Sequence, residues 1–197
     1  MNGGKQRRNP AIGIVLIALG RRSGFAQFGN DRDAFLGSLA PVLGFAIVLT
    51  VLAMARGAYR VGAEFFCAML IFLLTPPVIA DVFCRIWKRR EGWFRFSTIL
   101  TWSGTLGIAL SGVLVILLRL FLSQNEAPTA AEALSITFFV YGAWFTWFVA
   151  RHALDLSRLR SAAVALSIVV GSTLLVSAPF SVTGSPPAST SVHGSKG

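Results

Sequence analysis

Long apolar segments alternate with short polar breaks along most of this chain. Five of these segments have the length that a membrane crossing requires, since a hydrocarbon core of about 30 Å needs about 20 helical residues at 1.5 Å each. They cover residues 34–55, 61–87, 96–118, 131–150 and 161–180. The pattern predicts an all-α polytopic integral membrane bundle of five transmembrane helices over residues 34–180.

A basic segment, residues 1–33, precedes the first span. Within it, residues 11–20 form an apolar run of ten that ends at Arg21 and Arg22. The run is long enough for the apolar part of a signal peptide, but two arginines follow it where a cleavage site needs small residues. We expect instead a short interfacial helix on the cytoplasmic side, with the arginines at the level of the lipid phosphates. At the other end, the Ser, Gly and Pro composition of residues 181–197 predicts a disordered tail.

The distribution of Lys and Arg predicts the orientation of the five spans. With the N-terminus in the cytoplasm, the segments on the inside carry thirteen cations and those on the outside three. The inside cations are Lys5, Arg7, Arg8, Arg21, Arg22, Arg32, Lys88, Arg89, Arg90, Arg95, Arg151, Arg158 and Arg160, and the outside ones are Arg56, Arg60 and Lys196. Because cytoplasmic loops carry an excess of Lys and Arg, we expect a cytoplasmic N-terminus and an external C-terminus.

Composition limits the partners and the chemistry. The chain has 197 residues, a net charge of +10, and only 13% charged residues. The cations lie at the ends of apolar runs, which favours the bilayer and its anionic head groups as partners and argues against nucleic acid. Cys67 and Cys84 are about 25 Å apart on one predicted helix, and the two histidines, His152 and His193, stand alone. We therefore predict no metal, no cofactor, no catalytic residue and no enzyme activity.

Asp81 is the main candidate for a functional side chain, because ionisable residues within membrane helices are costly and often functional. Arg85 follows it by four residues, the favourable spacing for a helical ion pair. One interpretation is a carboxylate that relays protons or ions. The other is a pair that is neutralised locally near the interface, with Arg85 extending outward to the head groups.

The second span contains two successive prolines, Pro76 and Pro77. Each lacks an amide donor, so the carbonyl groups of Phe72 and Leu73 lose their helical partners. We expect the helix to kink or break there, and Thr75 to donate a hydrogen bond to Phe72 in partial compensation. A broken helix can line a substrate site in a transporter, and a kink can also serve packing alone.

Local sequence signals add two expectations about helix starts and helix packing. Thr129 and Glu132 have the spacing of a capping box that would open the fourth span. Small residues recur every four positions in the third and fifth spans, including Gly107 and Gly171. Such stripes let helix backbones approach closely, either within the bundle or between two copies of the chain in a homo-oligomer.

Three segments together resemble bacterial members of the YIP (Ypt-interacting protein) domain family. They are RSGFAQFGNDRDAFLGSLAP (22–41), PPVIADVFCRIWKRREGWFRFSTILTWSG (76–104) and WFVARHALDLSRLRSAAVALSIVV (147–170). The resemblance implies five membrane helices behind a cytoplasmic N-terminal tail, residence in a bacterial inner membrane and a role without catalysis. It carries over no site residues.

Two functions from different classes fit these observations. The first is a membrane-organising or scaffold protein that acts through helix packing and head-group contact. The second is a small transporter or channel subunit that uses the bend at Pro76 and Pro77 together with Asp81. The surroundings of Asp81 separate them, because transport requires a water-accessible cavity that reaches this carboxylate.

Overall fold

The computed structural model describes the backbone of residues 9–121 and 127–182, and the side chains of these residues except 127–128 and 176–182. In this part of the chain all regular structure is helical, which confirms the predicted fold class. The elements are α1 (Pro10–Ala18), η1 (Arg22–Gln27), α2 (Arg32–Ala55), α3 (Tyr59–Ile86), η2 (Arg90–Gly92), α4 (Trp93–Phe121), α5 (Ala127–Ala153) and α6 (Arg158–Val182). Five of them, α2 to α6, are long and apolar enough to cross a membrane. The predicted disordered tail lies outside the described residues.

The starts of the first two α-helices follow from polar residues in the sequence. The side chain of Asn9 accepts hydrogen bonds from the amides of Ala11 and Ile12, and Pro10 occupies the first turn of α1, where its missing amide is not needed. Asp31 caps α2 by accepting from the amide of Ala34 at 2.8 Å. The capping box predicted at Thr129 is wrong, because α5 already begins at Ala127 and Thr129 lies inside it.

Four helices end in a tight turn with one residue of positive φ. The residues are Gly20 (φ 72°), Gly57 (φ 79°), Lys88 (φ 54°) and Asp155 (φ 50°). In each turn the amide of the following residue reaches back to a carbonyl of the last helical turn, as Arg89 does to Cys84 at 2.9 Å. Glycine adopts this conformation without strain, whereas Lys88 and Asp155 do so at a cost.

Helix α3 continues through both prolines from Tyr59 to Ile86, so the helix break considered from the sequence does not occur. A bend within α3 stays a prediction. The expected hydrogen bond from Thr75 to Phe72 is wrong, since the Thr75 hydroxyl donates to the carbonyl of Ile71 at 2.6 Å. A threonine in a helix can bond three or four residues back, and here it reaches back four.

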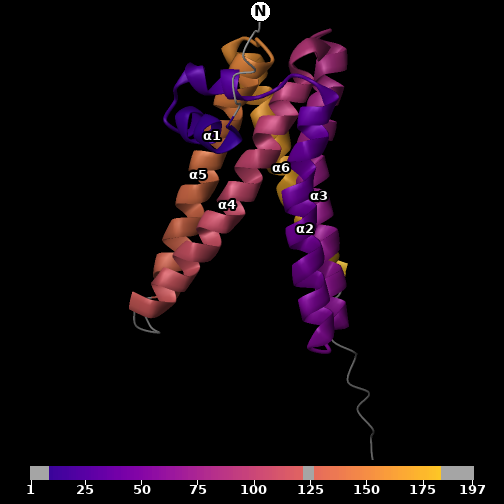
Figure 1. Ribbon diagram of the computed structural model, residues 1–197, viewed down its shortest axis with the longest axis vertical. Coiled ribbons are helices and arrows are strands. Elements are labelled where there is room, and N and C mark those ends of the chain that lie inside the picture. The colour runs from indigo at the N-terminus through magenta and orange to yellow at the C-terminus, as the bar shows by residue number, and fades with distance from the viewer. Residues whose placement is uncertain (1–8, 122–126, 183–197) are drawn as a thin grey trace, which may run out of the picture.

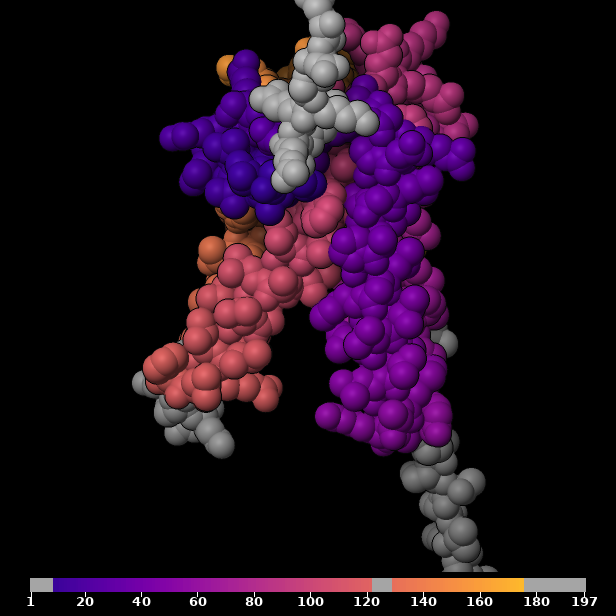
Figure 2. All heavy atoms as spheres, in the orientation of Figure 1, coloured from indigo at the N-terminus to yellow at the C-terminus, as the bar shows by residue number. Residues whose placement is uncertain are grey.

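The long helices form two limbs that meet at one end (Figure 1). Helices α4 and α5 form one limb, α2 and α3 form the other, and α6 packs on both α3 and α5. The limbs meet at the end that carries α1, η1, η2 and the turn 154–157, which we call the basic end. They separate toward the opposite, distal end, where Figure 2 shows open space between them.

The core of the bundle is concentrated at the basic end. Its buried apolar residues are Ile14, Ile17, Phe25, Phe28, Ala80, Cys84, Phe96, Ile99, Phe145, Phe148, Val149, Ala150, Ala153, Leu154, Leu156, Val164 and Ile168. Most come from α1, η1 and the basic-end portions of α3, α4, α5 and α6, while Phe28 directly follows η1 and Leu154 and Leu156 lie in the turn after α5. In contrast, the side chains of Leu120 and Phe121 at the distal end of α4 are exposed.

Helix α1 packs across α4 and α5 and supplies part of this core. Its close partner is η1, because a Cβ atom at Gly24 would lie 2.6 Å from the carbonyl oxygen of Gly13. The Tyr141 hydroxyl of α5 donates to the carbonyl of Ala18 at 2.8 Å and holds the end of α1. Ile12 and Val15 remain exposed on the other side of α1, so an apolar face is left for lipid. The interfacial position of α1 stays a prediction.

Candidate functional site

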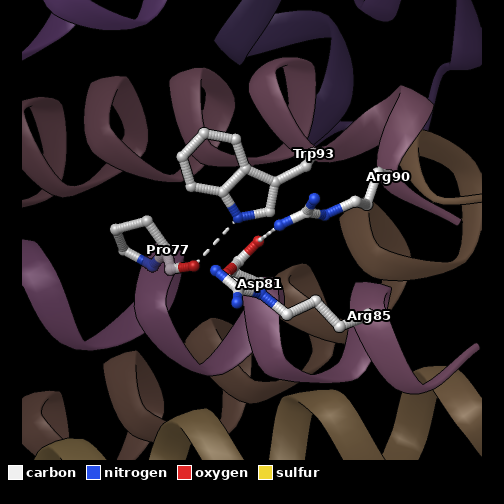
Figure 3. Close-up of polar contacts among 5 residues, drawn as sticks. All are labelled: Pro77, Asp81, Arg85, Arg90 and Trp93. Carbon is white, nitrogen blue, oxygen red and sulfur yellow. Dashed lines mark hydrogen bonds and ion pairs between the residues drawn. The ribbon is translucent and has the colours of Figure 1, made fainter. Parts of the chain in front are cut away.

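Asp81 lies on α3 near the basic end, where two arginines bind its two carboxylate oxygens (Figure 3). Arg85 contacts Oδ2 with Nη2 at 2.5 Å and with Nε at 2.6 Å. Arg90, from η2, places Nη2 at 3.4 Å from Oδ1. The side chain of Asp81 is 26% exposed. The carboxylate is therefore held between two guanidinium groups and not by the single partner that the sequence predicts.

The turn after α3 brings Arg90 back toward Asp81. Lys88 adopts a left-handed conformation and reverses the chain direction, so that η2 lies beside the last turns of α3. Asn30 fixes η2 from the other side, since its Nδ2 donates to the carbonyl of Glu91 at 2.6 Å and its Oδ1 accepts from the amide of Arg95. The run of three cations at 88–90 is the sequence signal for this contact, but the turn decides which of the three points at Asp81.

Trp93, the first residue of α4, closes the site against the prolines of α3. Its indole Nε1 donates to the carbonyl of Pro77 at 2.9 Å (Figure 3). Its ring centroid lies 5.4 Å from that of Phe35 on α2. Three helices, α2, α3 and α4, therefore meet at one point around Pro77, which is buried. Pro76 is half-buried beside it.

An open groove runs along α3 from this meeting point. It has a volume of about 840 Å³, and it is lined by Asp81, Arg85 and Trp93 together with apolar side chains of α2 and α3. Val78 and Val82, on its floor, are exposed to the surroundings of the bundle. Beside Asp81 the groove is open to the surroundings of the bundle.

The two glycines that represent the small-residue stripes, Gly107 and Gly171, differ in how closely another helix approaches them. A Cβ atom at Gly171 would lie 2.9 Å from Cδ1 of Ile79, so α6 closely approaches α3 there. At Gly107 no atom lies within 4 Å of that position, so this glycine makes no close helix contact within the described bundle, and a contact with a second copy stays a prediction.

Among the described residues, the cysteine and histidine side chains form no second polar site. Cys67 is exposed and Cys84 is buried, and both are free thiols. His152 hydrogen-bonds through Nδ1 to the carbonyl of Phe148 at 2.8 Å and lies among aromatic rings, including that of Phe25. Among the residues that the structure describes, no three His, Cys, Asp or Glu side chains are grouped so that they could hold a metal ion.

Tryptophan and arginine side chains pair around the basic end. The Arg160 guanidinium lies 5.6 Å from the ring centre of Trp87, and that of Arg151 lies 5.6 Å from the ring of Trp147. Such cation–aromatic contacts keep the arginines close to the level at which indole rings meet the membrane surface. The basic end therefore combines aromatic and cationic groups in the way that a membrane interface favours.

No protein-family model, curated protein or solved structure matches this chain. The resemblance to the YIP family therefore stays a prediction. What the five long apolar helices establish is an integral membrane protein.

Proposed function

We propose that this chain is a non-enzymatic, multi-pass membrane-organising or scaffold protein of the YIP type. In this proposal it resides in the bacterial inner membrane with its N-terminus in the cytoplasm. It acts by presenting the basic end to anionic head groups and by packing against other membrane helices, including those of a second copy. The support comes from the site around Asp81 and from the distribution of charge.

The state of Asp81 carries the proposal. A carboxylate that relays ions must be able to exchange its partners with water or with the transported ion. Here both oxygens already contact guanidinium groups, those of Arg85 and Arg90. The groove that exposes Asp81 is open to the surroundings of the bundle, where its exposed residues Val78 and Val82 would meet lipid. Such a group anchors the turn after α3 and places two arginines at the membrane surface.

One observation favours the alternative, a small transporter or channel subunit. The two limbs separate toward the distal end and leave a space between them (Figure 2). Transport through this space would require a polar group along it that could take part in coupling. Asp81 lies near the basic end instead, so the opening and the carboxylate lie toward opposite ends of the bundle.

A flux experiment separates the two functions. Under the scaffold proposal, Asp81→Asn should cost about 1 kcal/mol or less of stability, the scale of helical ion pairs, and should change no ion or proton flux in reconstituted vesicles. Glu64→Gln is the matched control, because Glu64 is paired with Arg60 by the same four-residue spacing at the distal end of α3. A proton-coupled flux that Asp81→Asn abolishes and Glu64→Gln preserves would overturn the proposal.

A further inference from the structure

The groove beside Asp81 is lined mainly by apolar side chains, and charged side chains line it toward the basic end. Its floor is a stripe on α3 made of Leu74, Val78, Val82 and Ile86, which recur every four residues and so share one helix face. The part of the stripe that precedes Arg85, from Leu74 to Val82, is about 12 Å long and fits within the depth of about 15 Å that one leaflet of the hydrocarbon core provides. Its shape and chemistry therefore suit a single extended hydrocarbon chain.

Walls from two other helices turn this stripe into a groove. Phe35 of α2 and Trp93 of α4 line it, and their rings contact each other. The Trp93 ring cannot turn away without losing its hydrogen bond to Pro77. The wall is thus held in place by the same contact that joins α3 and α4, and the groove exists before any ligand arrives.

The charged end has an excess of positive charge. Asp81 contributes one negative charge, whereas Arg85 and Arg90 contribute two positive charges. Arg85 binds Asp81 closely, but Arg90 lies at 3.4 Å from it through one nitrogen, so most of its donors are uncommitted. An arginine with free donors recognises phosphate well, because its planar group can form two parallel hydrogen bonds.

We propose that this groove binds one anionic phospholipid, with an acyl chain along the α3 stripe and the phosphate against Arg90 and Arg85. The inference deepens the proposed function and rests on its head-group contact, for which it names the ligand and the place. Charge complementarity selects this occupant. A partner helix would need apolar contacts along the whole groove, whereas Asp81 and Arg85 interrupt the apolar lining of this groove toward the basic end.

The first test compares lipids by their effect on thermal stability. The full chain, purified in an uncharged detergent, is titrated with phosphatidylglycerol or phosphatidylcholine, and the unfolding midpoint is measured. Ligands that bind the native state raise this midpoint, so we expect phosphatidylglycerol to raise it at lower concentration. Arg90→Gln should increase the half-maximal concentration of phosphatidylglycerol about tenfold, the scale of one charge-assisted hydrogen bond. The control Arg60→Gln removes an arginine from the other end of α3 and should leave that concentration unchanged.

A second variant tests the acyl-chain part without changing any charge. Val82 is 51% exposed on the groove floor, so a tryptophan there fills the groove without entering the core. Val82→Trp should abolish the preference for phosphatidylglycerol. Its control is Val61→Trp, because Val61 is 61% exposed on the same helix outside the groove. Asp81→Asn should act in the opposite direction and lower the phosphatidylglycerol concentration required, since it removes the one negative charge beside the phosphate.

Three results would overturn the inference. They are equal stabilisation by both lipids, a phosphatidylglycerol preference that survives both Arg90→Gln and Val82→Trp, and equal stabilisation by soluble glycerol phosphate, which would indicate a site for free anions. None of them bears on the flux measurement. Conversely, a proton-coupled flux that depends on Asp81 would overturn the scaffold proposal without changing the result of the lipid titration. The failure of the proposed function and the failure of this inference can therefore be told apart.

Discussion

The two ends of the bundle differ in how their helices are held together. At the basic end, segments from six of the helical elements contact one another, and Phe96 and Val149 are completely buried. At the distal end each long helix keeps few neighbours, and large apolar side chains point outward (Figure 2). The same five long helices therefore form one packed unit at the basic end and two hairpin-like limbs at the distal end.

The sequence of α4 shows why the difference arises. Its first turns carry Ser97, Thr98 and Thr101, all buried, and small polar groups of this kind fit into close helix contacts. Its distal part is rich in Val, Ile and Leu on every side. Because lipid tails are as apolar as these side chains, a membrane helix of that composition gains little by leaving lipid for another helix. Specific packing at the basic end therefore holds the fold, and the distal halves are free to meet lipid or a partner.

The largest expected effect separates the two ends of the bundle through one large apolar residue at each end of α4. Phe96→Ala should destabilise the protein by about 3–5 kcal/mol, because it leaves a cavity where the ring is now fully enclosed. Leu120→Ala, at the distal end of the same helix, should cost well under 1 kcal/mol, since its side chain is 71% exposed. Unfolding by denaturant in micelles measures both. Equal costs would show that the distal half is packed in solution and would remove the contrast.

Alanine substitutions at two glycines, one at the basic end and one in the middle of α4, test the difference in packing by adding a methyl group at each position. A Cβ at Gly92 would overlap the carbonyl oxygen of Ala153, and backbone cannot rotate away as a side chain can. Gly92→Ala should therefore cost about 1–3 kcal/mol. Gly107→Ala meets nothing within 4 Å, so it should be neutral or stabilise the helix by up to about 1 kcal/mol. A tolerated Gly92→Ala would mean that the contact between η2 and the end of α5 is not close.

Local spacing predicted part of this site, and the rest depends on tertiary structure. The bond between Asp81 and Arg85 follows from their four-residue separation on one helix, and the sequence therefore indicates it. The contact with Arg90 needs the left-handed turn at Lys88, a residue type that rarely adopts this conformation. The two glycine stripes have equal patterns, yet only Gly171 meets another helix, because the separation of the limbs is a property of the whole bundle. The five long helices could be predicted from the sequence, because the length and hydropathy of each apolar segment are enough to identify it.

The smallest expected effect concerns Lys88, whose strained turn belongs to the basic end. A left-handed conformation costs a residue with a side chain about 1–2 kcal/mol more than glycine, and the extra freedom of glycine in the unfolded chain offsets about 0.4–1 kcal/mol of that. Lys88→Gly should therefore raise the free energy of unfolding by about 0.5–1 kcal/mol, measured by the same denaturant titration. Lys88→Ala is the control, because it removes the charge and keeps the strain, and it should give no gain. If alanine stabilises as much as glycine, repulsion among the neighbouring cations is the cause, and the turn at Lys88 is not under strain.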